Sequence, residues 1–248
     1  MTSNSKKIIY PLISLAFWLL VWQVAAVAVD HQYFLPDIPT TLSALANVVT
    51  GKDFLLSVLY TFTRVLTGLT LGTLIGIAIA VLTHKSEVLH SIIAPALSVI
   101  KATPVATIII ILWVTLDGNS LAITVSFLMV MPIIWQNMSE GLRKIDKSLI
   151  EVSDVFELTL KERAKILIFP SLLRYFIPAF ITSVGFAWKS EIAAEIIANT
   201  RDSIGHGING AKQEFNSPEV FAWTLIIVLF SIALEWGLKK LLKRYDKL

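Results

Sequence analysis

Apolar residues gather into six long runs along the chain, separated by shorter segments that carry most of the charge. An α-helix rises about 1.5 Å per residue, so about 20 apolar residues cross the roughly 30 Å hydrocarbon core of a bilayer. Six segments reach or approach that length: residues 8–29, 57–82, 92–116, 121–138, 172–198 and 220–242. The pattern predicts an all-α membrane protein with about six transmembrane helices in a single domain, residues 1–248.

Lysine and arginine are concentrated on one set of the segments that connect these runs. If the N-terminus faces the cytoplasm, fifteen of them lie on the inner segments. The outer segments then contain three, Lys52, Arg201 and Lys212. Cytoplasmic loops of membrane proteins are enriched in Lys and Arg, so both termini are predicted to be cytoplasmic. The first run is too long for the apolar part of a signal peptide and lacks a small-residue cleavage site, so we interpret it as a retained span.

Composition narrows the class of protein further. A hydrophobic fraction of 55% exceeds that of an ordinary soluble domain, and a net charge of +3 is too small and dispersed to indicate nucleic-acid binding. Cysteine is absent, which excludes disulfides, thiolate zinc sites and Cys-ligated iron–sulfur clusters. The four histidines are scattered, so we expect no bound metal or other cofactor. The chain lacks a G-x-x-x-x-G-K-[ST] phosphate loop and the H-E-x-x-H and G-x-S-x-G signatures, which argues against an ATPase and against an intramembrane enzyme.

The segment between the fourth and fifth runs, residues 139–171, is rich in charge and carries two helix-start signatures. They are S-x-x-E at residues 148–151 and T-x-x-E at residues 159–162. In such a capping box the first side chain bonds a backbone N–H three residues later, and the Glu side chain bonds back. Two boxes eleven residues apart predict a helix, a tight turn near residues 157–158, and a second helix that ends near Pro170.

Leu149, Val152 and Phe156 fall on one face of the first of these helices and form an apolar stripe on an otherwise charged segment. An apolar stripe on a cytoplasmic helix needs a surface that buries it. The inner helix ends of the chain itself and a soluble partner protein both fit this requirement. Glu151 also has two interpretations, because it can cap its helix alone or cap it and contact a partner.

Small residues recur every four positions in the second run. Gly68, Gly72, Gly76 and Ala80 form one smooth helix face, against which another membrane helix can approach closely. We therefore predict a helix-packing face there.

Two short helices are predicted in the outer loops. Thr40 or Thr41 would cap the first. The second has apolar residues at helical spacing, so we expect it to lie on the membrane surface. These residues are Ile204, Ile208, Ala211 and Phe215.

Charged residues also lie within the predicted spans, where a charge at the bilayer centre costs about 2.5–3.5 kcal/mol. Arg64 lies near the outer end of its span, and its side chain can snorkel to the surface. Lys101 lies between Pro95 and Pro104, which are expected to break the third span, so it can reach the inner interface.

The fifth span carries a denser group of such residues. Lys189 falls in the outer half of the bilayer, and Glu191 and Glu195 share one helix face at i, i+4. Together with Trp188, for which packing is the alternative, these residues are candidates for a translocation path, a gate or a subunit contact. Arg64 and Lys101 are further candidates for the same path.

One segment carries a family resemblance. The sequence "EVSDVFELTLKERAKILIFP", residues 151–170, resembles the EAA loop of ABC importer permeases, with the Glu and the Pro at the family's spacing. The flanking sequences "LPDIPTTLSAL", "TFTRVLTGLTLG", "APALSVIKATPVATIIIILWV", "GLRKID" and "FAWKSEIAAEIIA" resemble the nitrate, sulfonate and taurine branch of these permeases. The resemblance extends over about residues 35–242.

The resemblance implies a type I importer permease of a bacterial inner membrane. It implies that a dimer of ATP-binding cassette ATPases, which holds the ATP and Mg, docks on the loop. A second permease copy, expected to be identical, and an extracytoplasmic binding protein would complete the system within membrane lipid. The solute would be a sulfonate such as taurine, nitrate or another small anion, or a vitamin precursor. The residues expected to couple the chain to the ATPase are Glu151, Val152, Ser153, Phe156, Glu157, Leu158, Thr159 and Pro170.

Glu157 departs from the family pattern, which has a glycine there that permits a left-handed turn. A residue with a Cβ pays on the order of 1 kcal/mol to adopt that conformation. Either the turn differs in this chain, or docking to the ATPase absorbs the strain.

A secondary transporter driven by an ion gradient is the alternative function. It would use Glu191 and Glu195 as proton or sodium sites within the membrane. Uptake that persists without any ATPase would favour this alternative.

Overall fold

The computed structural model describes residues 3–242, with the side chains of residues 3–8 and 147 excepted, and this part of the chain is helical throughout its regular structure. The predicted inner charges Lys243, Arg244 and Lys247 lie outside the described residues. The elements are α1 (Ser3–Val29), α2 (Ile38–Thr50), α3 (Phe54–Lys85), α4 (Glu87–Ala102), α5 (Val105–Trp113), α6 (Gly118–Arg143), α7 (Lys147–Val155), α8 (Leu160–Arg163), the π-helical segment η1 (Ala164–Ile168), α9 (Phe169–Ala198), α10 (Ile204–Gln213) and α11 (Ser217–Leu242).

Long apolar helices account for the predicted spans. Among the described residues, α1, α3, α6, α11 and the helix that contains α9 are long and apolar enough to cross a membrane. The third predicted run instead forms α4 and α5, which meet at an angle of 99°. The break lies at Pro104, because a proline cannot donate the backbone hydrogen bond that would continue α4. Pro95, the other proline expected to break this span, lies inside α4. Counting the bent pair as one crossing gives six spans.

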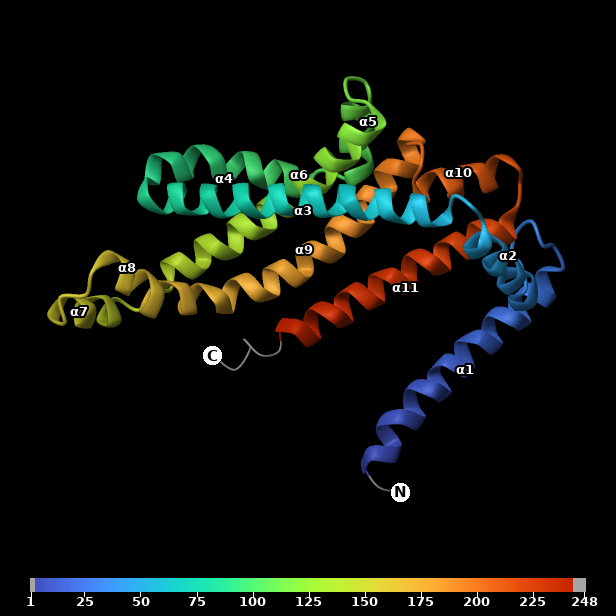
Figure 1. The fold of residues 1–248 in the computed structure, drawn as a ribbon, viewed down its shortest axis with the longest axis horizontal. Coiled ribbons are helices and arrows are strands. Elements are labelled where there is room, and N and C mark those ends of the chain that lie inside the picture. Colours follow the sequence, from blue (N-terminus) through green and yellow to red (C-terminus); the bar gives the residue numbers. More distant parts are fainter. Residues whose placement is uncertain (1–2, 243–248) are drawn as a thin grey trace.

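The core of the molecule is formed by α3, α6 and α9, which lie against one another along much of their length (Figure 1). The glycine face predicted in the second run lies against α6. A Cβ added at Gly68 would lie 2.6 Å from the Ser126 Cβ, and one at Gly72 would lie 2.7 Å from the Val130 Cβ. These glycines are required because the two backbones approach too closely for a side chain.

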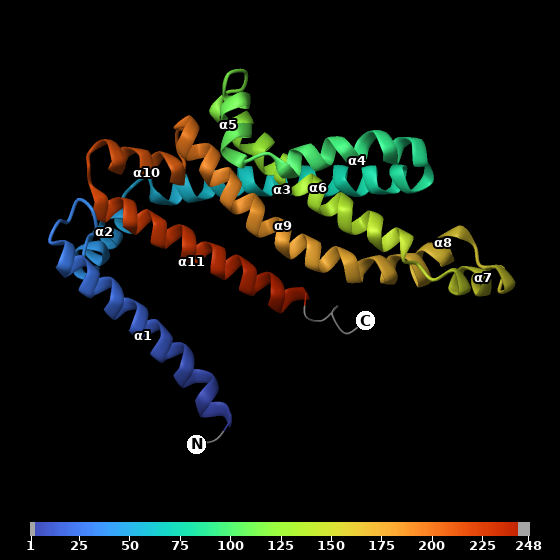
Figure 2. The same cartoon turned by 180° about the vertical axis from the view of Figure 1, so that it is seen from behind.

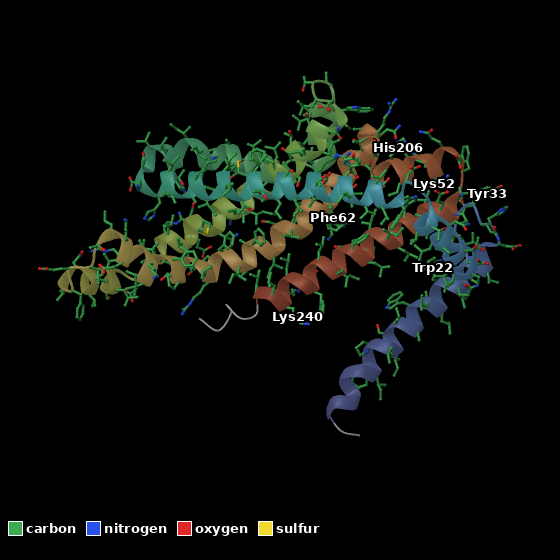
Figure 3. All side chains as sticks on the ribbon, viewed as in Figure 1. Trp22, Tyr33, Lys52, Phe62, His206 and Lys240 are labelled. Atoms are coloured by element: carbon green, nitrogen blue, oxygen red, sulfur yellow. The ribbon has the colours of Figure 1, made fainter. Side chains whose placement is uncertain are left out.

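The outer helices α1 and α11 surround this core only in part (Figure 2). Only 6% of the most apolar window of α1 is buried, and the helix diverges from the bundle. Its contact lies near its C-terminal end, where Trp22 Nε1 donates to the Pro36 carbonyl at 3.0 Å and the Gln23 side chain accepts from the Ile38 N–H at 3.0 Å (Figure 3). Such an exposed apolar helix is compatible with a hydrocarbon environment and not with water.

Pro170 does not end the second helix of the charged segment, contrary to the prediction. Instead α8 continues through η1 into α9, so that one continuous helix runs from Leu160 to Ala198. In an α-helix a proline ring clashes with the carbonyl four residues earlier. The wider π turn before Pro170, in which the Phe169 N–H bonds to the Ala164 carbonyl, gives the ring room.

Both short outer helices exist, but each differs from its prediction. Asp37, rather than Thr40 or Thr41, caps α2, and its carboxylate accepts from the Thr40 N–H at 2.8 Å. Hydrogen bonds from the side chain and the backbone of Thr40 lower the pKa of Asp37. Three of the four residues of the predicted apolar face, Ile204, Ile208 and Ala211, are buried against the protein, whereas Phe215 follows the end of α10 and is exposed.

Candidate functional site

The charged segment forms an elbow, which we define as residues 147–163. It consists of α7, a tight turn and α8, and it lies at the far end of the bundle from α2 and α10 (Figure 1). The apolar stripe of α7 is exposed: Leu149 is 47%, Val152 49% and Phe156 73% accessible. Of the two surfaces expected to cover the stripe, the inner helix ends within the described residues do not do so.

The two predicted capping boxes have different outcomes. The second is confirmed, since the Thr159 N–H donates to Glu162 at 2.9 Å and the Glu162 N–H donates to the Thr159 hydroxyl. The first is wrong: α7 begins two residues earlier than predicted, because Asp146 rather than Ser148 caps it, accepting from the Ser148 N–H at 2.9 Å. Glu151 consequently lies in the second turn of α7, too late to cap that helix.

The turn of the elbow is left-handed at Glu157, where φ is 49°. The Leu158 N–H donates to the Ser153 carbonyl at 3.0 Å, as in a Schellman turn, and the Ser153 side chain is buried beneath it. An ion pair between Asp154 of α7 and Arg163 of α8 joins the two arms. The turn therefore keeps the conformation that a glycine would favour, at a cost on the order of 1 kcal/mol.

A buried ion pair lies near the α10 end of the bundle. The Arg64 Nη1 of α3 is 2.7 Å from the Glu195 Oε1 of α9, and both side chains are removed from solvent. Arg64 also donates from Nε to the Asn119 side chain at 2.9 Å and from Nη2 to the Arg201 carbonyl at 3.2 Å. The prediction that Arg64 snorkels to the surface is therefore wrong, because its guanidinium has enough partners to remain buried.

Glu195, on α9, is held from two other elements, α3 and α10. The Thr61 hydroxyl of α3 donates to it at 2.9 Å, and the Gly205 N–H at the start of α10 donates at 3.2 Å. A Cβ at Gly205 would collide with Glu195, so only glycine lets α10 approach α9 this closely. The cluster of Arg64, Glu195 and Thr61, called here the ion-pair cluster, thus fixes α3, α9 and α10 to one another.

Sequence reasoning missed two members of this network. Thr61 could have been found, because it lies three residues before Arg64 and so shares its helix face within an apolar run. Asn119 gave no such signal, since it lies at the start of α6 and meets Arg64 only through tertiary packing.

The remaining charged candidates do not join the ion-pair cluster. Glu191, one turn before Glu195, is fully buried without a hydrogen bond. Lys101 is exposed and donates to the Gln136 side chain of α6. Trp188 is fully buried, its Nε1 donates to the Ile227 carbonyl at 3.2 Å, and its ring contacts Phe62, so its observed contacts are those of packing.

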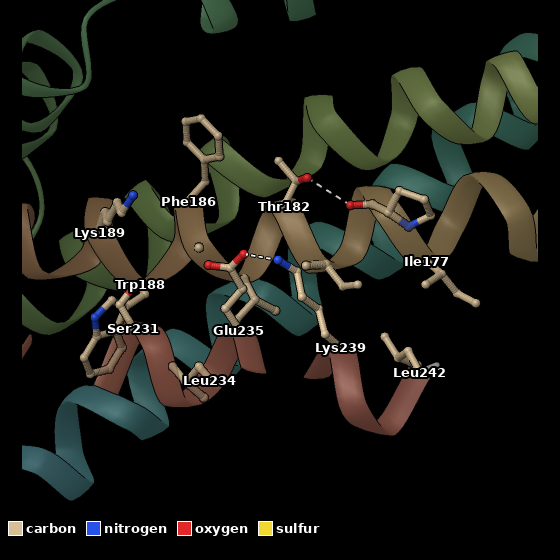
Figure 4. Close-up of a pocket in the computed structure, with 14 residues that line it drawn as sticks. Ile177, Thr182, Phe186, Trp188, Lys189, Ser231, Leu234, Glu235, Lys239 and Leu242 are labelled. Carbon is tan, nitrogen blue, oxygen red and sulfur yellow. Dashed lines mark hydrogen bonds and ion pairs between the residues drawn. The ribbon is translucent and has the colours of Figure 1, made fainter. Parts of the chain in front are cut away.

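Lys189 borders a groove between α9 and α11, with a volume of about 640 Å³ (Figure 4). Glu235 and Lys239 of α11 form an ion pair at its opposite wall. A second hollow of about 710 Å³ lies beside Arg64 and is lined by Asp117, Asn119 and Arg201 among others. No group of three or more acidic or histidine side chains that could hold a metal occurs within residues 3–242.

Long apolar helices joined by a buried ion-pair cluster, with a polar elbow at one end, define a multi-pass membrane protein. Residues 72–247 match the family model described as the binding-protein-dependent transport system inner membrane component, and the chain belongs to that family. It is thus the permease subunit of an ABC importer, a transport subunit without enzymatic activity, and ATP hydrolysis occurs on a separate subunit.

Three relatives show the range of this family. The chain is 22% identical to the taurine transport system permease protein of Escherichia coli, over 97% of this chain and 90% of the relative. It is 25% identical to a nitrate import permease of Synechocystis, over 78% and 73% of the two chains. It is 23% identical to a bicarbonate transport system permease of Synechococcus elongatus, over 84% and 78%.

The fold is also that of a solved transporter. A crystal structure of an amino acid ABC transporter with histidines matches with a TM-score of 0.61 at 15% identity, over 84% of this chain and 94% of that one. The predicted all-α permease fold is therefore confirmed. The alternative of a secondary transporter finds no support in the family or in the fold.

Proposed function

We propose that this permease imports a small anionic or zwitterionic solute through a passage formed with a second copy of the chain. The relatives named above transport taurine, nitrate and bicarbonate, which are all small and carry an anionic group. Other sulfonates, and a vitamin precursor that carries an anionic group, belong to the same proposal, because specificity in such systems usually resides in the binding protein.

The elbow is the observation that carries the coupling part of the proposal. Its apolar stripe is exposed, its turn is closed by backbone hydrogen bonds, and the Asp154–Arg163 ion pair joins its arms. A preorganised helix with apolar anchors is suited to docking in a groove of a partner at a small entropic cost. We assign the ATPase as that partner, with Val152 and Phe156 as anchors and Ser153, Glu157, Leu158 and Thr159 shaping the turn.

An exposed stripe on α9 supports the proposed passage. Thr182, Phe186 and Lys189 point outward along one side of this helix, and Gly185 lies among them with open space beside it. A lysine exposed within a membrane span has to face water, a partner or a lipid headgroup. Facing a water-filled passage between two copies, Lys189 would attract an anionic solute.

The predicted topology places the elbow and both termini in the cytoplasm. The natural absence of cysteine allows a direct test with single substitutions at exposed positions, Lys161→Cys on the elbow and Lys212→Cys on α10. In intact spheroplasts a membrane-impermeant maleimide is expected to label K212C, and K161C only after permeabilisation. Labelling of K161C in intact cells would contradict the topology.

Uptake by proteoliposomes tests the proposed function as a whole. With the permease, its ATPase and its binding protein present, we expect ATP-dependent accumulation of at least one of three probes: taurine, nitrate or bicarbonate. Omission of ATP, of the ATPase or of the binding protein should abolish it. Accumulation that continues without the ATPase and collapses with the ion gradient would refute the proposal.

A further inference from the structure

Glu191 is a fully buried carboxyl group to which no N–H or hydroxyl group of the described residues donates a hydrogen bond, and its polar neighbour is the carboxyl group of Glu195. It lies one helical turn before Glu195 on α9, on the same face of that helix. An ionised carboxylate without a partner carries a large free-energy penalty in an apolar interior, and buried charges are normally paired. The burial of Glu191 therefore raises the question of its protonation state, which the ion-pair cluster does not answer.

The charged groups beside Glu191 are Glu195, one turn later on the same face of α9, and Arg64 of α3, which is paired with Glu195. Arg64 is already engaged, since its guanidinium bonds Glu195 at 2.7 Å, Asn119 at 2.9 Å and the Arg201 carbonyl at 3.2 Å. Two carboxyl groups thus share one guanidinium, and that guanidinium contacts Glu195 only. If both were ionised, the buried group would carry one uncompensated negative charge.

The other helices that pack against α9 bring no further counter-charge. The central part of α6 and all of α5 contain no ionisable residue. On α10, His206 and Lys212 are exposed. On α11, Glu219 bonds Asn216, and Glu235 is paired with Lys239. The environment of Glu191 therefore favours a neutral side chain.

We propose that Glu191 is a proton-binding site that is occupied in this conformation of the permease. One proton from water binds one carboxylate oxygen, an O–H bond forms, and the charge of the side chain changes from −1 to 0. The neutral carboxylic acid fits the apolar contact between α9 and its neighbours, whereas Glu195 stays ionised against Arg64. The site needs no metal ion, and the proton is bound rather than transported.

The position of the site links its proton to the contact between α3 and α9. If nucleotide binding to the ATPase opens that contact, Arg64 leaves Glu195 and water enters. The Glu191 proton can then dissociate, because the ionised carboxylate has water or the guanidinium as a partner. Each opening would release one proton and each closure would take one up. This second step rests on the proposed function, whereas the occupied proton site does not.

Infrared spectroscopy of the purified permease at neutral pH tests the site without any transport assay. We expect the carbonyl stretch of a protonated carboxyl group in the wild type and its loss in Glu191→Gln, a neutral variant of similar shape. Glu235→Gln is the matched control, since Glu235 is ionised against Lys239, and it should keep the band. If Glu191→Gln does not fold, Glu191→Met provides the same readout. The proposal would be overturned if the carbonyl band of the protonated carboxyl group were unchanged in both Glu191 variants. It would also be overturned if the variants lost the band of an ionised carboxylate instead.

A pH-sensitive dye in the complete transporter tests the second step. Trapping the nucleotide-bound state is expected to release one proton per permease chain in the wild type and none in Glu191→Gln. Equal release by both proteins would overturn the link to opening. If the complex fails to hydrolyse ATP, the proposed function fails, and the infrared band still decides whether the proton site exists.

Discussion

Replacing Phe156 with alanine and Val152 with aspartate is expected to weaken binding of the ATPase to the permease by about 30-fold or more. The truncation of one apolar anchor at a well-packed contact costs about 2 kcal/mol, which corresponds to roughly that factor. The aspartate adds an unpaired charge to the buried contact. Co-purification and a binding isotherm between the two subunits, in detergent, measure the effect.

Two control variants make this result specific. Phe215→Ala removes an aromatic side chain of similar exposure, 78% against 73% for Phe156, from the opposite end of the molecule, so it should leave binding unchanged. Glu157→Gly should also preserve binding, because glycine adopts the left-handed turn without strain. Full ATPase binding by the double variant would disprove the docking role of the stripe.

Replacing Arg64 with alanine is expected to destabilise the permease by about 3–5 kcal/mol. The substitution leaves Glu195 buried without its counter-charge, which is the costly way to break a buried ion pair. Arg64→Lys should recover only part of the loss, because a lysine cannot bond Glu195, Asn119 and the Arg201 carbonyl at once. Unfolding in detergent, followed by circular dichroism, measures the difference.

The controls for Arg64 separate pairing from packing. Thr63→Ala alters the exposed neighbour on α3 and should not affect unfolding. Arg64→Met combined with Glu195→Gln removes both charges and should be more stable than Arg64→Ala alone. If Arg64→Ala unfolds like the wild type, the ion pair does not fix α3 to α9.

Hydropathy and small-residue spacing predicted the parts of the fold that depend on the membrane alone. The apolar runs predicted the spans because, in hydrocarbon, the backbone N–H and C=O groups of each segment must form hydrogen bonds within its own helix. The Gly68–Gly72–Gly76 spacing predicted a packing face because a helix that is closely approached by another needs a small residue at every fourth position of the contact. Both signals are local, so the sequence could reveal them.

Two kinds of feature were harder to predict: those for which neighbouring residues could take the same role, and those that depend on partners far away in the sequence. Asp146 and Ser148 are both good caps, and the sequence did not reveal which would begin α7. Arg64 was assigned to the surface because its partners Glu195 and Asn119 lie 131 and 55 residues away in the chain. Pro170 was taken as a helix end because the pattern gave no sign that a π turn would accommodate it.

The unbroken helix from Leu160 to Ala198 places the second arm of the elbow and Glu195 on a single element of 39 residues, roughly 58 Å long. If the ATPase holds one end and the ion-pair cluster the other, thermodynamic linkage applies between them. If nucleotide binding to the ATPase weakens the Arg64–Glu195 contact by some factor, then breaking that contact must change the affinity for the nucleotide by the same factor. Disruption of the ion pair should therefore be detectable at the distant ATP site as a changed nucleotide affinity.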